Sequence, residues 1–401
     1  MSDLTAMKDR VLARIQEKDL IDLSRELIRR PSVTGQEKEV SDYIVSVMNG
    51  IGLDARGVEG QPGRPNAVGT LRGVGGGLNT MLSGHLDTVP IGDPKKWITD
   101  PYGGEVIGGK IYGRGSMDSK GGGIASSVIA LKAIMDEGIR LKGDVHIVGT
   151  VDEEVLGPAG AKFLAKSRVI DPDICLYCVH SDMEVKAYFK GIFWARLVSK
   201  GQTAHGSMPQ MGVNAITRAA RFLVDLEKSG LPYKKHPVLG DMTISYGWIH
   251  AGPERKYNVV ADHCEMGIDI RTLPGQSTEG VLQELRRVAD RIMADDPQAN
   301  LTLDRFDGDE AFEMVNDNPT LDIIKRVAAE VMGAEPRVGG TIAAGDLGPW
   351  FALGKKGVGF GPGDLERGNA HKENEFLEID QLVAASRIYA AFILETAGVA
   401  E

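Results

Sequence analysis

A histidine and an aspartate two residues apart follow an apolar segment near residue 80. They are His85 and Asp87, in the motif Ser83–Pro90 (SGHLDTVP). At this spacing both side chains leave the same face of an extended backbone. One ring nitrogen of His85 could bind a metal while Asp87 orients the ring through the other nitrogen. Alone the pair is a weak signal, because many His-x-Asp pairs lie in turns without a ligand.

Three acidic clusters and a late histidine strengthen the prediction of a metal site. Their candidate ligands and bases are Asp118, Asp152, Glu153, Glu154, Asp182 and His371. Strands are predicted at 79–84, 145–151 and 173–180. The first ends at the His85–Asp87 pair and the other two end at acidic clusters, and a helix is predicted at 121–137. Strands that alternate with helices indicate parallel pairing, and ligands bind at the carboxyl ends of parallel strands. We therefore expect a two-metal hydrolase.

Composition excludes several classes of protein. The 401 residues suggest two domains, and the net charge of −10 argues against a nucleic-acid surface. No apolar run approaches the ~18 residues of a membrane span, and the polar N-terminus does not resemble a signal peptide. Three cysteines fit a reducing cytoplasm. Cys175 and Cys178 lie in an apolar segment and are interpreted as core residues.

The texture of the chain changes near Lys190, where an α+β insertion begins. Strands are predicted at 193–198, 242–249 and 265–271, and helices at 213–226 and 278–293. After about Leu303 the α/β texture returns and ends in a helix at 380–395. The predicted fold is α/β with two domains. Residues 1–188 and 303–401 form a mixed-sheet catalytic domain, and 189–302 form an inserted dimerisation (lid) domain.

The N-terminal region carries helical periodicity over 4–30, which Pro31 ends. Ser32 and Thr34 are candidate caps of a second amphipathic helix. Outside the acidic clusters, four histidines have no acidic constellation around them, and a structural or surface role is the better interpretation. They are His146, His236, His250 and His263.

The motifs resemble those of the zinc amidohydrolase family that includes acetylornithine deacetylase, succinyl-diaminopimelate desuccinylase, carboxypeptidase G, aminoacylases and several dipeptidases. The resemblance runs through nearly the whole chain. It rests on the segments Gly84–Pro90, Gly113–Gly122, Asp152–Glu154, Asp269–Gly275 and His371–Glu375. So many matches in the right order make it specific.

The resemblance implies a ligand set for two divalent metals. His85 and Asp182 would bind one ion, Glu154 and His371 the other, and Asp118 would bridge both. Imidazole and carboxylate ligands suit Zn²⁺, with Co²⁺ or Mn²⁺ as substitutes. A bridging carboxylate can hold two ions about 3.5–4 Å apart. The residue pair after Asp118 resembles a family site that often has a non-proline cis peptide.

By the same resemblance Glu153 is the general base. It would deprotonate the water between the metals, whose hydroxide is the nucleophile, and pass the proton to the leaving amine. Asp87 would hydrogen-bond the far nitrogen of His85. The alternative interpretation of residues 152–154, a solvated loop, is disfavoured by the apolar strand before them.

His205 lies in the predicted insertion. A family histidine at this place reaches into the partner subunit's site and stabilises the tetrahedral oxyanion. The resemblance therefore implies a homodimer formed through the insertion; without it, His205 is a loop histidine of no clear purpose. Arg271 and Asn258 are implied substrate contacts, since the arginine fork suits a carboxylate, and Thr341 lies in a weaker substrate-loop motif.

The sequence departs from part of the family at Asp182. Deacetylases, desuccinylases and carboxypeptidase G usually have glutamate there, whereas the aminopeptidase and dipeptidase branches favour aspartate. His180 is an alternative ligand. The predicted function is hydrolysis of an amide C–N bond in a small N-acyl amino acid that carries a carboxylate. A dipeptidase, a carboxypeptidase or hydrolysis of another small C–N bond are alternatives. A metal-free binding protein would need a lost ligand or base, and every position is filled.

Overall fold

The computed structural model describes residues 2–253, 256–342 and 345–400. The chain divides into two compact units. The first comprises Met1–Ala187, Met314–Gly339 and Gly345–Glu401, and the second comprises Tyr188–Glu313 and Gly340–Ala344. The expected return to the first domain at residue 303 falls inside strand β12 (Asn300–Asp309), which belongs to the second unit.

The main sheet is mixed. Its strands follow the order β1-β2-β6-β3-β7-β15-β8-β13, with β14 paired to β8. β6, β3, β7 and β15 are parallel to one another, and the remaining pairs along the sheet for which a register is given are antiparallel. The bounds are β1 Asp54–Gln61, β2 Arg64–Leu71, β3 Thr80–His85, β6 Val145–Thr150, β7 Ile174–Tyr177, β8 Val185–Phe189, β13 Phe312–Glu313, β14 Val338–Thr341 and β15 Lys356–Gly359. The predicted mixed-sheet α/β fold is confirmed.

The central parallel strands are buried on both faces of the sheet. Every residue of β3, β6 and β7 is buried, as expected of strands covered on both faces. β3 ends at His85, β6 at Thr150 and β7 at Tyr177, so the three carboxyl ends meet at one edge of the sheet. β7 is shorter than the predicted strand 173–180, and residues 178–180 follow it in irregular backbone.

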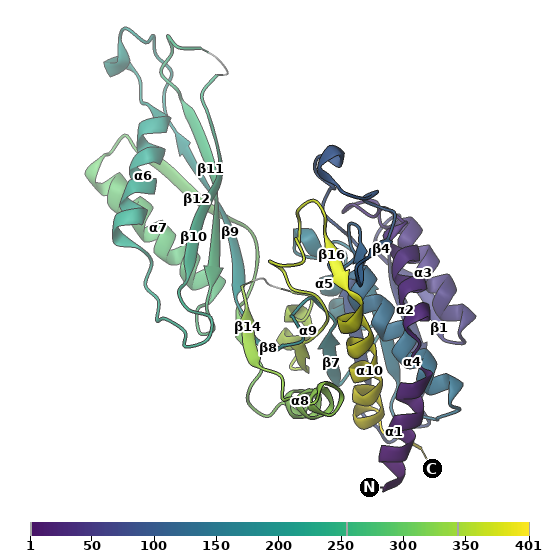
Figure 1. Ribbon diagram of the computed structural model, residues 1–401. Helices are drawn as coiled ribbons and strands as arrows, with labels where there is room; N and C mark the ends of the chain where they lie inside the picture. Colours follow the sequence, from purple (N-terminus) through teal and green to yellow (C-terminus); the bar gives the residue numbers. More distant parts are fainter. Residues whose placement is uncertain (1, 254–255, 343–344, 401) are drawn as a thin grey trace. The chain divides into compact units, whose positions relative to one another are not determined.

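The helices of the first unit are α1 Ser2–Arg14, α2 Glu17–Ile28, α3 Lys38–Gly50, α4 Ala125–Asp136, α5 Ala161–Ser167, α8 Pro319–Met332, α9 Gly348–Ala352 and α10 Ile379–Thr396 (Figure 1). The single helix expected over 4–30 is broken at residues 15 and 16. α4 and α10 pack together, α3 packs on β1 and β2, and α8 packs on β15. A π-helical turn, η2 (Lys120–Ile124), precedes α4. A Cβ on Gly123 there would lie 1.9 Å from the Cys178 carbonyl oxygen, so only glycine fits.

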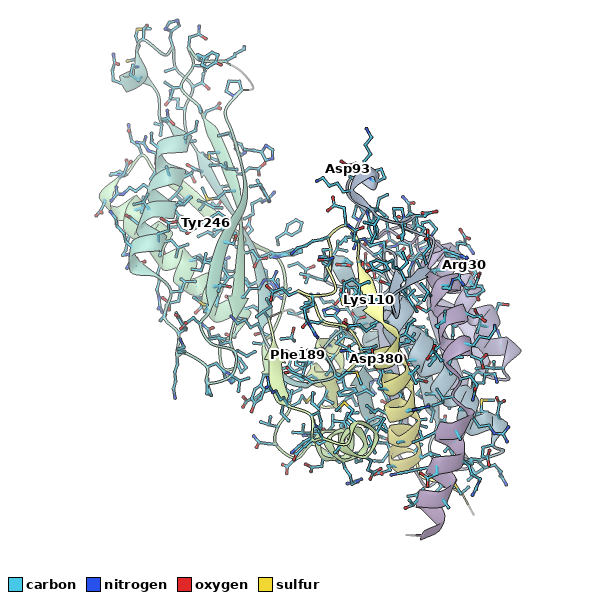
Figure 2. All side chains as sticks on the ribbon, viewed as in Figure 1. Arg30, Asp93, Lys110, Phe189, Tyr246 and Asp380 are labelled. Carbon is cyan, nitrogen blue, oxygen red and sulfur yellow. The ribbon has the colours of Figure 1, made fainter. Side chains whose placement is uncertain are left out.

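A small antiparallel sheet completes the first unit. It joins β16 (Phe376–Glu378), β5 (Lys110–Tyr112) and β4 (Glu105–Ile107). The Lys110 ammonium, labelled in Figure 2, lies 3.8 Å from the centre of the Phe376 ring. This contact ties β5, which precedes Asp118 in the chain, to β16, which follows His371.

The second unit is a four-stranded antiparallel sheet in the order β10-β11-β9-β12, with two helices against it (Figure 1). The bounds are β9 Gly191–Lys200, β10 Thr243–Ala251, β11 His263–Thr272, β12 Asn300–Asp309, α6 Ala215–Ser229 and α7 Thr278–Asp295. The helices and sheet enclose a separate apolar core, against which Tyr246 of β10 packs (Figure 2). Five of these six elements match predicted strands or helices closely; β12 was not predicted, because its second half is mostly polar.

Within the described residues, no helix combines the length and the apolar character needed to cross a membrane.

Candidate metal centre

The Asp118 carboxylate lies at the centre of a cluster of histidines and a glutamate. His85 Nε2 lies 3.0 Å from Asp118 Oδ1, and His180 Nδ1 lies 3.1 Å from the same oxygen. On the other side, His371 Nε2 lies 3.0 Å from Asp118 Oδ2 and 3.2 Å from Glu154 Oε2. Each carboxylate oxygen of Asp118 therefore faces its own set of donor atoms.

The sheet edge brings these residues together. His85 ends β3, Glu154 lies in the short turn η3 (Glu153–Val155) after β6, and His180 follows β7. Asp118 precedes the turn η2, and the peptide bond that follows it is cis. His371 has a φ of 61°, a conformation that costs side-chain-bearing residues about 1–3 kcal/mol and is concentrated at functional sites.

The donor atoms of Asp118, Glu154 and His371 lie close enough together to hold one divalent cation. Imidazole nitrogens and carboxylate oxygens are the usual ligands of Zn²⁺, and two ligands of one tetrahedral zinc lie about 3.3 Å apart. The observed separations around Asp118 are 3.0 to 3.2 Å. His180 Nδ1 is buried and makes no hydrogen bond within the described part of the chain. A nitrogen that faces a carboxylate oxygen without bonding to it is what two ligands of one cation present.

Asp182 lies differently from its predicted role. Its carboxylate forms an ion pair with Arg367 and accepts a hydrogen bond from Gln381 Nε2 over 2.9 Å. The side chain is 38% exposed, whereas that of His180 is 12% exposed. The prediction that Asp182 binds the first metal is therefore not supported by these contacts, and the alternative, His180, takes the place beside His85 and Asp118. His180 and Asp182 are two residues apart and would point to the same side of an extended strand. Spacing alone therefore does not show which of them lies beside Asp118.

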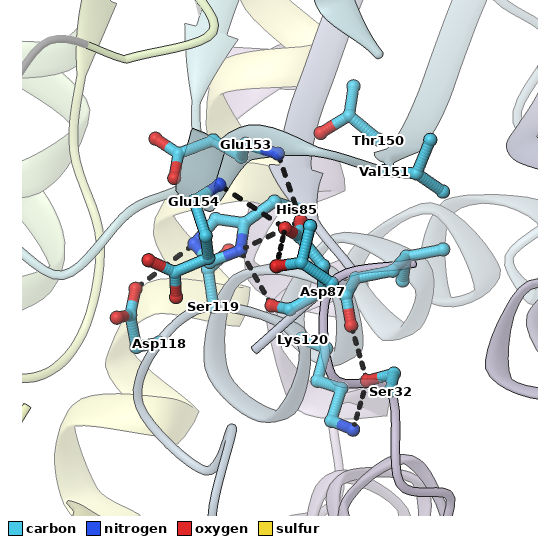
Figure 3. A network of polar contacts seen from close by, with 12 residues as sticks. Ser32, His85, Asp87, Asp118, Ser119, Lys120, Thr150, Val151, Glu153 and Glu154 are labelled. Atoms are coloured by element: carbon cyan, nitrogen blue, oxygen red, sulfur yellow. Dashed lines mark hydrogen bonds and ion pairs between the residues drawn. The ribbon is translucent and has the colours of Figure 1, made fainter. Parts of the chain in front are cut away.

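Asp87 contacts both His85, at the end of β3, and the turn that follows β6. Its backbone carbonyl, rather than the expected carboxylate, lies 3.0 Å from His85 Nδ1; the carboxylate is 3.7 Å away. The carboxylate instead accepts hydrogen bonds from the backbone N–H groups of Glu153 (3.1 Å) and Glu154 (3.2 Å), as Figure 3 shows. Thr34, predicted as a helix cap, donates its hydroxyl to the same carboxylate. Asp87 thus positions the 153–154 turn against His85.

Glu153 lies beside the cluster without joining it (Figure 3). Its Oε1 accepts a hydrogen bond from the Tyr177 hydroxyl over 3.0 Å. Burial raises the pKa of Glu153 well above its ordinary value, and although His85 opposes this, the Asp346 and Glu154 carboxylates add to it. A carboxyl group whose pKa is raised in this way suits the transfer of a proton. The turn that carries Glu153 is not a solvated loop, because Asp152 before it is buried and paired with Arg64.

The charges of the cluster are strongly coupled. Burial opposes the ionisation of Asp118, yet the imidazoles of His180, His371 and His85 hold the pKa of its carboxyl well below the usual range. Hydrogen bonds to Asp118 and Glu154 raise the pKa of His371 to about 10. Burial by itself would lower the pKa of His85. The nearby carboxylates outweigh this effect and raise the pKa of His85 well above its ordinary value. The excess of carboxylate charge favours a cation here.

A buried ion pair supports the Asp118 loop, and neither of its residues carries a predicted role. Arg114 Nη1 lies 2.5 Å from Glu375 Oε2, and both side chains are almost completely buried. Glu375 also accepts hydrogen bonds from the backbone N–H groups of Met117 and Asp118. Arg114 donates to the backbone carbonyl of Lys372, next to His371. The pair therefore links the loops that carry Asp118 and His371.

Lys120 is another buried charge near the centre. Its ammonium donates to the Arg30 carbonyl and to the Ser32 hydroxyl, each over 2.8 Å (Figure 3 shows the contact with Ser32). Burial lowers the pKa of Lys120 to about 7. Ser32, which was predicted as a helix cap, therefore anchors the turn that follows Asp118.

The remaining predicted site residues lie in the second unit. His205 is exposed, and its Nδ1 lies 2.8 Å from the Ser207 hydroxyl. Asn258 is beside it in the fold, because its carbonyl accepts a hydrogen bond from Gly206 N. Arg271 donates from Nε and Nη2 to the Asp269 carboxylate, and the Thr341 carbonyl accepts from Lys190 N. His205 and Asn258 are thus brought together.

Comparison with known proteins decides the family. The model of peptidase family M20/M25/M40 matches residues 81–395, which include every residue of the cluster. The chain belongs to this family.

Two curated relatives and one solved structure illustrate the range of the similarity. An acetylornithine deacetylase of Photorhabdus laumondii is 28% identical over 391 residues, which cover 93% of this chain and 96% of the relative. An N-formyl-4-amino-5-aminomethyl-2-methylpyrimidine deformylase of Bacillus subtilis is 26% identical over 409 residues, 94% of each chain. The M20 metallo-carboxypeptidase Sso-CP2 of Sulfolobus solfataricus superposes with a TM-score of 0.77 at 16% identity, covering 93% of this chain and 98% of that one.

Proposed function

We propose that this family member hydrolyses the amide C–N bond of a small N-acyl amino acid with two bound divalent metal ions. The observation that carries the proposal is the Asp118 carboxylate, whose two oxygens face two separate sets of ligand atoms, with Glu153 beside them. The deacetylase and deformylase among the relatives remove acyl groups from small amino compounds, as their names state.

In this proposal His85 and His180 would hold one ion, Glu154 and His371 would hold the other, and both ions would share Asp118. Bound metal ions supply positive charge that lowers the pKa of water and polarises the amide carbonyl. Glu153 removes a proton from the attacking water and delivers it to the leaving nitrogen. Asp87 holds the backbone of Glu153 and Glu154 in place. Zn²⁺ is the proposed metal, because three of the five donors are imidazoles, and Co²⁺ or Mn²⁺ could replace it.

The second unit is proposed to supply the substrate contacts. Arg271 uses Nε and Nη2 on Asp269, and no hydrogen bond from its Nη1 is found in the described ranges. That nitrogen would bind the carboxylate of the substrate. Asn258 and Thr341 are proposed as further contacts. A carboxypeptidase or dipeptidase is the second candidate function, favoured by the fold shared with the metallo-carboxypeptidase.

We further propose a cytoplasmic homodimer formed through the second unit. His205 would then reach the site of the partner copy and donate a hydrogen bond to the developing oxyanion. Its exposed loop position supports this role, since within one copy its ring contacts only Ser207 among the hydrogen bonds found. Cys175, Cys178 and Cys264 are buried and free of disulfides, which is consistent with a reducing compartment.

The test is hydrolysis of a mixed library of N-acetyl, N-formyl and N-succinyl amino acids and dipeptides by Zn²⁺-loaded protein, with amine release followed by mass spectrometry. Release from the acyl compounds supports the proposal, and release from dipeptides alone favours the second candidate. The Glu153→Ala variant should lose at least ~10²-fold in kcat while it keeps its metal. Full activity and full metal content in that variant would refute the role of Glu153.

A further inference from the structure

A tyrosine hydroxyl is buried at the carboxyl end of β7. Tyr177 is the last residue of this strand and is 2% exposed. Its neighbours in the segment 174–179 are apolar or cysteine, so its hydroxyl is a polar group in an otherwise apolar strand. A buried hydroxyl requires a hydrogen-bond partner. The partner is Glu153 Oε1, at 3.0 Å.

The hydrogen bond has a defined direction. Burial raises the pKa of the Tyr177 phenol well above its ordinary value, and the nearby carboxylates of Glu153 and Asp346 add to this shift. The phenol therefore keeps its proton and donates a hydrogen bond to Glu153. In the described ranges, no other hydrogen bond to the Glu153 carboxylate is found, whereas the backbone of Glu153 is held separately by Asp87.

The packing around the ring fixes where the hydroxyl lies. A Cβ on Gly345 would lie 2.6 Å from Tyr177 Cε1, so the ring lies directly against the backbone at that glycine. β7 is bonded to β3 and β15 on its two sides, so the strand itself is fixed within the sheet. A rigid donor on a central strand can therefore hold the end of a flexible glutamate side chain.

We propose that Tyr177 is a positioning residue for the general base: its hydroxyl holds Glu153 Oε1, which leaves Oε2 to accept the proton of the attacking water. The inference rests on the proposed function. In the step, an O–H bond of water breaks, its proton goes to Oε2, and the oxygen forms the new bond to the acyl carbon as the carbonyl π bond opens. The C–N bond then breaks as the carbonyl re-forms, and the leaving nitrogen takes the proton from Oε2. The proton of Tyr177 stays on its own oxygen. A glutamate without this contact samples other rotamers and presents Oε2 to the water less often.

The matched control is Tyr389→Phe. Tyr389 is also a fully buried tyrosine of the first unit, and its hydroxyl donates to the Phe360 carbonyl over 2.8 Å. Both Tyr177→Phe and Tyr389→Phe remove one hydroxyl and one buried hydrogen bond. The two variants should therefore lose similar thermal stability and keep their metal, and they should differ in catalysis alone.

The experiment measures kcat and KM of the Zn²⁺-loaded proteins on whichever N-acyl amino acid of the library wild type hydrolyses fastest. We expect Tyr177→Phe to lower kcat about 10-fold with KM and metal content unchanged, and Tyr389→Phe to leave both constants unchanged. In the Glu153→Ala background, Tyr177→Phe should cause no further loss, because a residue that acts through Glu153 has nothing left to position.

Four results would overturn the inference. Wild-type kcat in Tyr177→Phe, while Glu153→Ala has lost its activity, would refute the role of Tyr177 and leave the proposed function standing. An additional 10-fold loss in the double variant would show that Tyr177 acts independently of Glu153. Glu153→Ala that retains full activity would refute the role of Glu153 and the inference with it. Wild type that releases no amine from any library member would refute the proposed function and the inference together.

Discussion

His180 Nδ1 lies 3.1 Å from Asp118 Oδ1, the same carboxylate oxygen that His85 Nε2 approaches to 3.0 Å. The His180 nitrogen is buried and forms no hydrogen bond with the described residues. Two imidazole nitrogens therefore approach the same carboxylate oxygen, and one of them has no hydrogen bond within the described ranges. A cation bound beside Asp118 Oδ1 would use these donors, and this relationship leads to the first prediction.

Exchange of His180 should remove one metal ion. We expect His180→Ala to bind about one equivalent of Zn²⁺ fewer than wild type and to lose at least ~10²-fold in kcat, because the exchange removes a direct ligand of the metal. The number of bound zinc ions is checked by elemental mass spectrometry of the dialysed proteins. The paired variant is Asp182→Asn, which disturbs only the contacts to Arg367 and Gln381. A full metal complement in His180→Ala, with loss of metal in Asp182→Asn, would restore the assignment made from the sequence.

Exchange of Asp87 should impair catalysis more than metal binding. Its carboxylate accepts the backbone N–H groups of Glu153 and Glu154, while its carbonyl, which contacts His85, survives any side-chain exchange. Asp87→Ala should therefore lower kcat about 10- to 100-fold and weaken metal affinity by a similar factor at most, the effect typical of residues that orient ligands. Kinetics at saturating Zn²⁺ give the first number. Unchanged kcat would show that the turn is held without Asp87.

The ion pair between Arg114 and Glu375 should be important for stability. Removal of one partner leaves the other charge buried and uncompensated, at a cost of about 3–5 kcal/mol. We therefore expect Glu375→Ala to lower the free energy of unfolding by about that amount in urea titrations. Glu373→Ala is the comparison, because Glu373 forms a surface ion pair with Lys96 at 3.7 Å, and such pairs contribute little to stability. Equal effects of the two exchanges would contradict this account.

His146 should make the protein less stable in acid. It is buried, its Nδ1 lies 3.0 Å from the Thr70 hydroxyl, and burial lowers its pKa to about 4. Between pH 6.5 and about 4 the unfolded chain binds a proton at this residue that the folded chain does not. Stability contributed by His146 is therefore present above pH 6.5 and is lost as the pH falls to about 4, up to about 3 kcal/mol in all.

The measurement is the free energy of unfolding as a function of pH, in wild type and in the variants His146→Gln and His236→Gln. His146→Gln should lower stability at pH 8 but flatten the slope between pH 6.5 and 4. His236→Gln, at a side chain near Glu313 in the second unit, should leave the slope unchanged below pH 6. A wild-type slope that His146→Gln does not alter would show that other groups cause the acid sensitivity.

The resemblance of the motifs predicted most of the cluster around Asp118, and the apolar runs before His85 and Glu154 placed these two residues at strand ends. His85, Asp118, Glu154 and His371 are brought together as the motifs implied. Asp182 is not, because β7 ends at Tyr177 and the irregular backbone beyond it has no periodicity from which side-chain direction can be inferred. Asp182 itself has a φ of 53°, which no residue spacing indicates.

Other features were hidden for physical reasons. Strand β12 contains the polar run Asp304–Asp309, because one face of its sheet is not covered by helices, and the expected domain boundary fell within it. The contact between Tyr177 and Glu153 joins residues that are 24 positions apart. Its signal was a single hydroxyl in an apolar segment, which fits an ordinary core tyrosine equally well until the partner is known.

The most direct test of the central claim is a titration of metal-free protein with Zn²⁺ while amine release from the best N-acyl amino acid is recorded. The account predicts no release without metal and a rise in rate that reaches its plateau at two equivalents per chain. Metal content measured on the same samples should give the same stoichiometry. Full activity in the metal-free protein, or binding of no more than one ion with a plateau at one equivalent, would contradict a centre in which Asp118 bridges two metals.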